Sequence, residues 1–472
     1  MVKKFRAMAK PLIIFICITF IGGALYIGGM SFFGGKNDAY AAVATVNGEP
    51  ITLYDLLNAL NQELYYYQMY YGELDFSTLE TIRYYVYDNL VNNSLITQAL
   101  AQRKYKIAED DIKAEMTRFK ELYGQELLDQ SGVTDAQIRE YVTVQLQFDK
   151  LVEDVTSQVV VSEQEIIDYY EAVRASHILV RVDSDDQEAW DQAKAEAEKI
   201  LAQLDTMDFA EAAMTYSDDS SAVNGGDLGF IYRGQTVEPF EQAAFSLAVG
   251  EVSDLVKTQY GYHIIKVTDK KVAEGEEFES AKESIREQLL KQKQNQVFNT
   301  WLAEQRSQAE VVILDKQLAA YEYLVNGNYD KAIETYQKAI DEDPENGYLY
   351  ALLGQVYAQQ EQLEPALTAY EQAVKYIQND AQIYFILGSL YQELGQQQEA
   401  ISAYLRVSEL RSYDLVTQYL VRSRLTELNA GEDAIAVVDK RIADISKLYE
   451  DAAQSSTSDA ATAEMDSQGE TE

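Results

Sequence analysis

Residues 174–180 read Arg-Ala-Ser-His-Ile-Leu-Val, and residues 260–267 read Tyr-Gly-Tyr-His-Ile-Ile-Lys-Val. Both runs are rich in β-branched and aliphatic residues, which is typical of short buried strands. Each run contains one histidine, His177 or His263, and the chain of 472 residues has no other. An isolated histidine in a strand is usually a core residue held by one polar neighbour. Two of them at the ends of one short block predict a shared polar network.

The block between the two runs carries a series of ordered motifs, many of them containing glycine. They are Ser176-His-Ile-Leu179, Gly226-Asp-Leu-Gly229, Arg233-Gly-Gln235, Pro239-Phe240, Gly250-Glu-Val-Ser253 and Gly261-Tyr-His-Ile-Ile265. With these motifs, residues 171–270 resemble the parvulin family of peptidyl-prolyl isomerases along their whole length. The resemblance implies an α+β domain that accelerates cis–trans isomerisation of X-Pro peptide bonds.

The resemblance also implies a catalytic group of four residues. His177 and His263 are then the paired histidines at the floor of the site, and Thr258 bonds one of the imidazoles. Asp219 stands where parvulins carry a cysteine or an aspartate close to the rotating carbonyl. An aspartate excludes covalent catalysis through a thiol, so the implied mechanism is non-covalent. The alternative is that the histidines only orient their strands and the pocket for the proline ring does the catalysis.

The proline pocket is implied to consist of Leu228, Ile231, Thr236 and Phe240. Two of these depart from the family pattern, because Thr236 stands where parvulins usually carry methionine and Ile231 where an aromatic residue is common. A smaller and more polar wall grips proline less well, so we expect low turnover. The loop 181–187 reads Arg-Val-Asp-Ser-Asp-Asp-Gln, whereas phospho-specific parvulins carry basic residues there to meet the phosphate. Phosphoserine-proline substrates are therefore not expected.

The overall composition excludes several other classes of protein. A formal net charge of -39 argues against binding to nucleic acid and against docking on anionic lipid heads. Cys17 is the only cysteine, so there is no intrachain disulfide and no CxxC metal or redox site. With two histidines in all, a zinc enzyme is not expected, and we predict neither a metal nor a cofactor.

The N-terminus predicts a membrane anchor. A basic segment, residues 1–10, precedes an apolar run over 11–34, and about 20 such residues span a bilayer. Basic residues before the run and an acidic chain after it place the N-terminus in the cytoplasm and the bulk outside the plasma membrane. The alternative is a signal peptide cleaved after the Ala-Tyr-Ala of residues 39–41, although the run exceeds the usual length of such a segment. Ile16 disfavours a lipid attachment at Cys17.

Residues 42–170 and 271–314 predict a second, mainly helical domain. Ala-Thr-Val-Asn-Gly at 44–48 predicts a strand and a turn, helical patterns continue to about residue 170, and a long helix over 278–308 precedes a strand over 309–314. With Ile-Arg-Glu-Gln-Leu-Leu at 285–290, this arrangement resembles the SurA/PrsA-like exported chaperones. In those chaperones a helix from after the parvulin domain completes the N-terminal domain. Unfolded exported proteins are the implied clients, and surplus tyrosines such as those at 65–67 either pack in the core or line a surface that holds them.

An internal repeat of 34 residues follows. Its most regular members are the pairs Ala332-Ile333, Ala366-Leu367, Ala400-Ile401 and Ala434-Ile435. This period is that of tetratricopeptide repeats, which stack as an α-solenoid. Residues 315–448 therefore predict three regular repeats and a degraded terminal one, with Arg422 in the glycine position and Val438 in the tyrosine position. We expect a groove for a protein partner, or alternatively a spacer without peptide specificity, and a disordered acidic tail over 449–472.

The sequence thus predicts a multidomain protein with an N-terminal transmembrane helix, a mainly α chaperone domain, an inserted α+β parvulin domain and an α-solenoid. The first functional hypothesis is a membrane-anchored extracytoplasmic foldase. The second is a non-catalytic chaperone or scaffold that uses the parvulin fold and the repeats only to bind proteins. His177, Asp219 and His263 favour the first hypothesis, and Ile231 and Thr236 favour the second.

Overall fold

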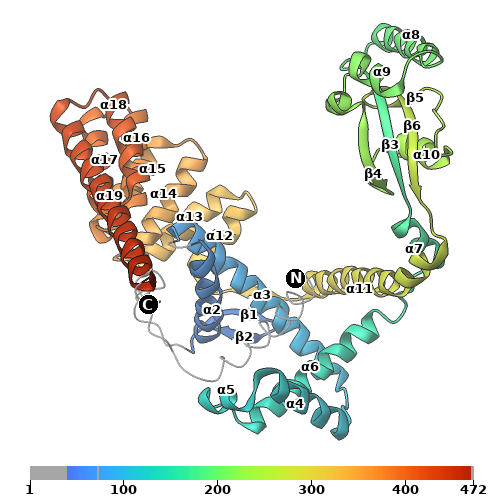
Figure 1. Cartoon of the computed structure of the whole chain (residues 1–472). Helices are drawn as coiled ribbons and strands as arrows, with labels where there is room; N and C mark the ends of the chain where they lie inside the picture. The colour runs from blue at the N-terminus through green and yellow to red at the C-terminus, as the bar shows by residue number, and fades with distance from the viewer. Residues whose placement is uncertain (1–39, 72–73, 469–472) are drawn as a thin grey trace. The chain divides into compact units, whose positions relative to one another are not determined.

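A computed structural model describes residues 40–71 and 74–468 (Figure 1). The chain divides into two compact units, one formed by residues 1–148 with 304–472 and the other by 149–303. Within the described residues no helix is long and apolar enough to cross a membrane. The predicted basic segment, 1–10, and the predicted anchor, 11–34, lie outside the described residues.

A small antiparallel sheet opens the first unit. Strands β1 (Ala42–Val46) and β2 (Glu49–Thr52) form a hairpin, and β7 (Val311–Ile313) pairs with the other edge of β1. Asn47 and Gly48 both have positive φ, 53° and 84°, as the predicted Asn-Gly turn requires. The prediction that a strand from after the parvulin block returns to this domain is confirmed.

Five helices follow the hairpin, and the last three of them share a small apolar core around Ile112, Phe119 and Ile138. The Thr134 and Gln137 side chains form the predicted cap at the start of the fifth. The predicted tyrosine surplus divides between core and surface, because Tyr87 is buried while Tyr65 is exposed. The helices are α2 (Leu53–Tyr71), α3 (Phe76–Arg103), α4 (Glu109–Tyr123), α5 (Gln125–Gln130) and α6 (Asp135–Val155).

The second unit contains the parvulin block between two helices. Helix α7 (Glu163–Tyr170) begins with the predicted capping box of Ser162 and Glu165, and α11 (Gly275–Gln308) is the predicted long helix. The two helices share an apolar cluster that includes Ile166 and Phe278. The packing of these two helices therefore holds the start and the end of the parvulin block close together.

The block itself is a four-stranded antiparallel sheet of order β4-β3-β6-β5. Two helices share an apolar core with one face of the sheet, and a third packs on the other face. The elements are β3 (Ala172–Arg181), α8 (Gln187–Gln203), α9 (Phe209–Tyr216), η1 (Ser220–Asn224), β4 (Asp227–Tyr232), α10 (Glu238–Ser246), β5 (Val256–Thr258) and β6 (Gly261–Lys271). Helix α10 is the one that covers the histidine-bearing face, so the site lies between it and the sheet.

Eight helices after β7 confirm the predicted helix-turn-helix repeats. A Cβ added to Gly354 or Gly388 would lie 2.8 Å from the ring of Tyr370 or Tyr404, which explains why glycine and tyrosine recur together. In the fourth repeat both positions change, and Arg422 pairs with Asp439 instead. The helices are α12 (Lys316–Val325), α13 (Tyr329–Glu342), α14 (Gly347–Gln359), α15 (Leu363–Tyr376), α16 (Ala381–Glu393), α17 (Gln397–Leu410), α18 (Leu415–Glu427) and α19 (Glu432–Gln468).

The prediction of a disordered tail over 449–472 is wrong as far as Gln468, because α19 continues to that residue. The segment is rich in alanine, the best helix former, and it extends a helix that is already nucleated. Low apolar content prevents a segment from forming its own core, but it does not prevent the continuation of a packed helix.

The sequence did not reveal that α3 packs against the first repeats. Phe76 of α3 belongs to the apolar core of the repeat helices. Farther along α3, Arg83 lies 2.8 Å from Asp315, the N-cap residue of α12, and Glu80 accepts a hydrogen bond from Gln317. Helix α3 and the first repeats therefore share one apolar core.

Candidate active site

The register of the sheet brings the two histidines together. In the β3–β6 pair His177 stands opposite Ile265, and His263 stands opposite Leu179. Diagonal neighbours on one face of an antiparallel pair are within reach of long side chains. The two imidazole rings stack with their centroids 5.4 Å apart, and their Nδ1 atoms are separated by 3.2 Å.

The network extends beyond the histidines at both ends. Thr258 Oγ1 lies 2.8 Å from His263 Nε2, and Asp219 Oδ1 lies 3.1 Å from His177 Nε2. Asp219 is itself held as the N-cap of η1, where it accepts hydrogen bonds from the amide and the hydroxyl of Ser221. The structure thus places all four residues of the implied catalytic group in one line of contacts.

The neighbouring groups indicate which nitrogen of each imidazole carries the proton. With both imidazoles neutral, the Asp219 carboxylate requires a proton on His177 Nε2, so His177 Nδ1 accepts from His263 Nδ1–H. His263 Nε2 then accepts from the Thr258 hydroxyl, whose oxygen accepts from the Tyr260 amide at 3.1 Å. No two lone pairs face each other in this arrangement, and the one contact that lacks the alignment of a hydrogen bond is that of His177 Nε2 with Asp219 Oδ1, at 3.1 Å.

The electrostatics of the site agree with that assignment. Burial and the neighbouring His177 lower the pKa of His263 to about 4, against the opposing effect of Asp219. Burial raises the pKa of Asp219, but the hydrogen bonds from Ser221 and from His177 outweigh burial and hold that pKa below its ordinary value. At neutral pH the site therefore combines a neutral His263 with an ionised Asp219.

Phe240 lies edge-on against both histidines. Its ring centroid is 5.6 Å from that of His177 and 5.3 Å from that of His263, with interplanar angles of 79° and 83°. Pro239 in the first turn of α10 sets the start of the helix that carries it. Phe240 is only 3% exposed, so it packs against the dyad and also forms the floor of the predicted pocket.

A β-bulge in β4 places Leu228 on the histidine-bearing face. Ser176 pairs with Asp227 and Val173 with Ile231, so β4 has one more residue than β3 between these pairs. Gly229, with φ of 71°, accommodates the bulge, and its amide donates to the Asp227 carboxylate. Without the bulge, two side chains three residues apart on a strand would point to opposite faces. With it, Leu228 and Ile231 share the face of His177.

The two unusual wall residues differ in their surroundings. Ile231 is buried in the cluster under α10, together with Val173 and Phe240. Thr236 keeps a buried hydroxyl oxygen that has no hydrogen-bond partner. An unsatisfied buried hydroxyl is unfavourable, and it leaves a polar group in a wall that should be apolar.

Two supporting features of the site were not predicted. Ser221 fixes the Asp219 carboxylate, and an aspartate two residues before a serine at a helix start is the sequence pattern that indicates such a cap. Gly226 lies so close to β3 that a Cβ there would be 2.3 Å from the His177 carbonyl oxygen, and its φ is 77°. The loop that carries Asp219 can therefore approach His177 only with glycine at position 226.

Comparison with known proteins agrees with these features. Residues 161–271 match the family model of the PPIC-type PPIASE domain, and residues 1–152 match that of the SurA-like N-terminal domain. Tetratricopeptide repeat models match residues 323–390 and 381–414.

Several foldases are similar in sequence. Foldase protein PrsA of Geobacillus kaustophilus is 43% identical over 189 residues, which cover 38% of this chain and 62% of that protein. Foldase protein PrsA of Caldanaerobacter subterraneus is 33% identical over 318 residues, which cover 61% of this chain and 92% of that protein. The chain therefore belongs to the PrsA foldase family, as a parvulin-type peptidyl-prolyl isomerase with a SurA-like N-terminal domain and added tetratricopeptide repeats.

Proposed function

We propose that the protein is a membrane-anchored foldase outside the cytoplasm, which isomerises X-Pro bonds in unfolded exported proteins by a non-covalent mechanism. The observation that carries this proposal is the unbroken line from Thr258 through His263 and His177 to Asp219, packed against Phe240. A structural core would not require four polar side chains in series beside an apolar wall.

The proposed mechanism needs no bond between protein and substrate. Rotation about an X-Pro bond crosses a barrier of about 18–20 kcal/mol because amide resonance is lost in the twisted state. Leu228 and Phe240 hold the proline ring and exclude water, which favours the less polar twisted state over the planar one. The carbonyl rotates beside the Asp219 carboxylate, which is one quarter exposed, and the hydrogen bonds behind it keep that charge in place.

We further propose that the substrates carry no phosphate. Asp183, Asp185 and Asp186 surround the loop after β3 with negative charge. The guanidinium of Arg181 lies 3.4 Å from the Asp218 carbonyl oxygen, while the Asp218 carboxylate accepts from the Arg181 amide. A phosphate dianion would meet repulsion here instead of a basic cluster.

An isomerisation assay on non-phosphorylated prolyl peptides tests the proposed activity in the full chain. We expect the wild type to exceed the uncatalysed rate and Asp219→Ala to lower kcat/KM about tenfold to a hundredfold. The variant loses a charge-assisted hydrogen bond worth about 1.5–3 kcal/mol. The rate should stay level from about pH 8 to pH 5.5 and fall below that, because His263, with a pKa near 4, gains a proton only in acid.

The same assay separates this function from binding without turnover. The unpartnered Thr236 hydroxyl in the pocket wall is the observation that favours the second function. A wild-type rate equal to the uncatalysed rate, together with binding of the same peptide, would establish the non-catalytic chaperone. A phosphorylated serine-proline peptide that turns over faster than its unmodified form would contradict the proposed preference.

The anchor and the orientation are supported by the sequence of residues 1–34, with basic residues before a long apolar run. Exposed tyrosines such as Tyr65, Tyr70 and Tyr85 offer apolar area with polar tips for holding unfolded clients.

Protease added to intact cells tests the orientation. We expect it to remove everything beyond residue 41 while a tag placed before residue 1 stays protected. Protection of the long C-terminal part would contradict the outward orientation. A mature chain that begins at residue 42 would show cleavage in place of a retained anchor.

A further inference from the structure

Helix α3 covers one face of the first two repeats. Phe76 enters their apolar core, Ser77 accepts a hydrogen bond from Gln355, and the Thr81 and Tyr321 hydroxyls lie 2.8 Å apart. Tyr321 and Gln355 are 34 residues apart, so they occupy the same position in consecutive repeats. The first helices of the first two repeats, α12 and α14, therefore offer this face to another helix.

The same face is exposed in the fourth repeat. Gln317, which binds Glu80 of α3, is 7% exposed, whereas Tyr419 is 54% exposed at the position three repeats later. Leu318 is fully buried, and Leu420 at the corresponding position is 42% exposed. The face that α3 covers at the start of the array thus continues uncovered at its end.

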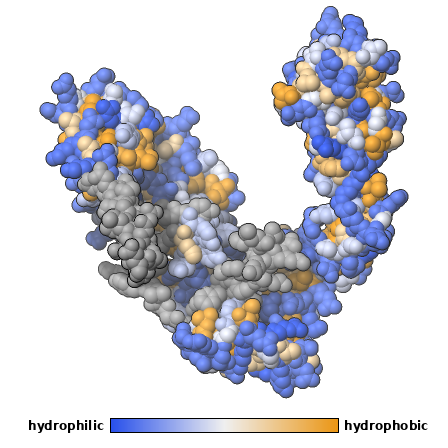
Figure 2. All heavy atoms as spheres, in the orientation of Figure 1, coloured by the Kyte–Doolittle hydropathy of each residue, from blue (hydrophilic) through white to orange (hydrophobic). Residues whose placement is uncertain are grey.

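Four large apolar residues form a stripe on this uncovered face of α18. Tyr413 precedes the helix and is 78% exposed, Val416 is 77% exposed, and Tyr419 and Leu420 complete the stripe. The last repeat of a solenoid ordinarily has a polar outer face that keeps the array soluble. A contiguous apolar surface at this position marks an interaction site. Figure 2 shows how apolar side chains gather among the hydrophilic ones on the repeat helices.

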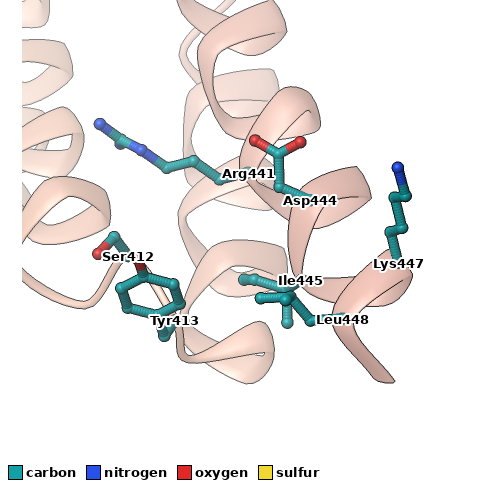
Figure 3. A pocket seen from close by; sticks show the side chains of 7 residues that line it. All are labelled: Ser412, Tyr413, Arg441, Asp444, Ile445, Lys447 and Leu448. Atoms are coloured by element: carbon teal, nitrogen blue, oxygen red, sulfur yellow. The ribbon is translucent and has the colours of Figure 1, made fainter. Parts of the chain in front are cut away.

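A cavity of about 470 Å³ opens beside the stripe, between the turn that precedes α18 and the helix α19. Figure 3 shows Tyr413 across from Ile445 and Leu448, which form its apolar side. Because Tyr413 belongs both to the stripe and to the cavity wall, the two form one continuous surface.

The charges of this region allow a second copy of the chain to approach. Residues 315–414 contain six Lys and Arg against sixteen Asp and Glu, and the whole chain has a net charge of -39. Residues 415–448 contain five of each sign, so the fourth repeat is neutral. Two copies of so acidic a chain repel each other elsewhere, but they meet without repulsion at this repeat.

Two arginines of α18 near the stripe are already paired. Arg422 lies 2.5 Å from Asp439, and Arg424 lies 3.0 Å from Glu427. An acidic peptide or an anionic lipid surface would have to break these pairs to bind either arginine. A neutral apolar partner would not.

We propose that the stripe formed by Tyr413, Val416, Tyr419 and Leu420 is a dimer interface, at which α18 packs against α18 of a second copy. A two-fold axis places the same surface on both sides, so the tyrosines and aliphatic residues meet their own equivalents. The contact is small, and interfaces below about 1,200 Å² are typical of weak complexes. We therefore expect a reversible dimer with a dissociation constant in the micromolar range.

Sedimentation of the full chain in detergent, over about 1–100 μM, tests this proposal. The wild type should shift from monomer to dimer, and Val416→Glu should weaken the dimer at least tenfold. Glutamate is favourable in the first turn of a helix, so this variant should keep its fold and its circular dichroism. Val325→Glu is the control, because Val325 is also an exposed valine, 51% against 77% for Val416, at the end of α12 and away from the stripe.

Cysteine crosslinking in native membranes gives an independent readout. Cys17 is the only cysteine, so Leu420→Cys in a Cys17→Ser chain has a single thiol. Oxidation should give a disulfide-linked dimer, whereas Tyr376→Cys in the same background should not. A wild type that stays monomeric would overturn the proposal and leave the stripe to a helix of another protein. A dimer that Val416→Glu leaves unchanged would also overturn it, because the contact would then lie elsewhere.

Discussion

Phe240→Ala is expected to lower kcat/KM for prolyl peptides about a hundredfold. The substitution removes the ring that packs edge-on against both His177 and His263, at 5.6 and 5.3 Å between centroids. It also removes the apolar floor on which the proline ring is proposed to rest. A hundredfold loss of rate corresponds to about 2.7 kcal/mol of lost transition-state stabilisation. Deleting a buried phenylalanine usually lowers the free energy of unfolding by about 3–5 kcal/mol, so the fold of the variant must be checked separately.

The matched control for this variant is Phe245→Ala. Phe245 lies on the same helix, α10, and packs under the Arg233 guanidinium, but it has no ring contact with the histidines. Both variants lose a phenylalanine from one helix, but Phe245 is only partly buried, so thermal unfolding should show less destabilisation for Phe245→Ala than for Phe240→Ala. Only Phe240→Ala should lose the isomerase rate, and Phe240→Leu should recover part of it. A folded Phe240→Ala protein with the wild-type rate would show that the proposed pocket is wrong.

The sequence was sufficient to locate the candidate site because its signals are local. Both histidines lie in runs whose composition predicts strands, and ordered motifs give the positions of Asp219 and Phe240. The details that decide chemistry were not predictable in this way. The bulge that brings Leu228 onto the face of His177 depends on how β3 and β4 pair, and the tautomers depend on the Tyr260 amide.

In the fold as well, local features could be predicted from the sequence and long-range contacts could not. Regular spacing predicted the repeats and the helix α11, because one helix or one repeat forms its pattern from its own residues. The contact between α3 and the repeats joins Phe76 to residues more than 240 positions away, and no local pattern records it. The continuation of α19 was missed for a different reason, because polarity was taken as a sign of disorder where alanine content favoured a helix.

Arg83→Met is expected to destabilise the junction between α3 and the repeats by about 3–5 kcal/mol. Arg83 is 1% exposed, and its guanidinium lies 2.8 Å from Asp315 and 3.7 Å from Glu80. Glu80 is fully buried, and burial raises its pKa to about 7 although Arg83 lowers it. Removing the arginine leaves two carboxylates without their shared counter-charge. Methionine keeps the volume, so the loss comes from the charge and not from a cavity.

Hydrogen exchange of the α3 and α12 amides measures this local opening in the full chain, where a single global unfolding free energy is not defined. Glu80 has a folded-state pKa above its ordinary 4.5, so its contribution is present at low pH and is lost as pH rises towards 7. The effect of Arg83→Met should therefore be larger at pH 8 than at pH 5, and Glu80→Gln in the same chain should restore part of the protection. Arg118→Met, at a surface arginine paired with Glu115, should change neither helix. Equal protection in wild type and Arg83→Met at pH 8 would show that apolar packing around Phe76 alone holds the chaperone helices to the repeats.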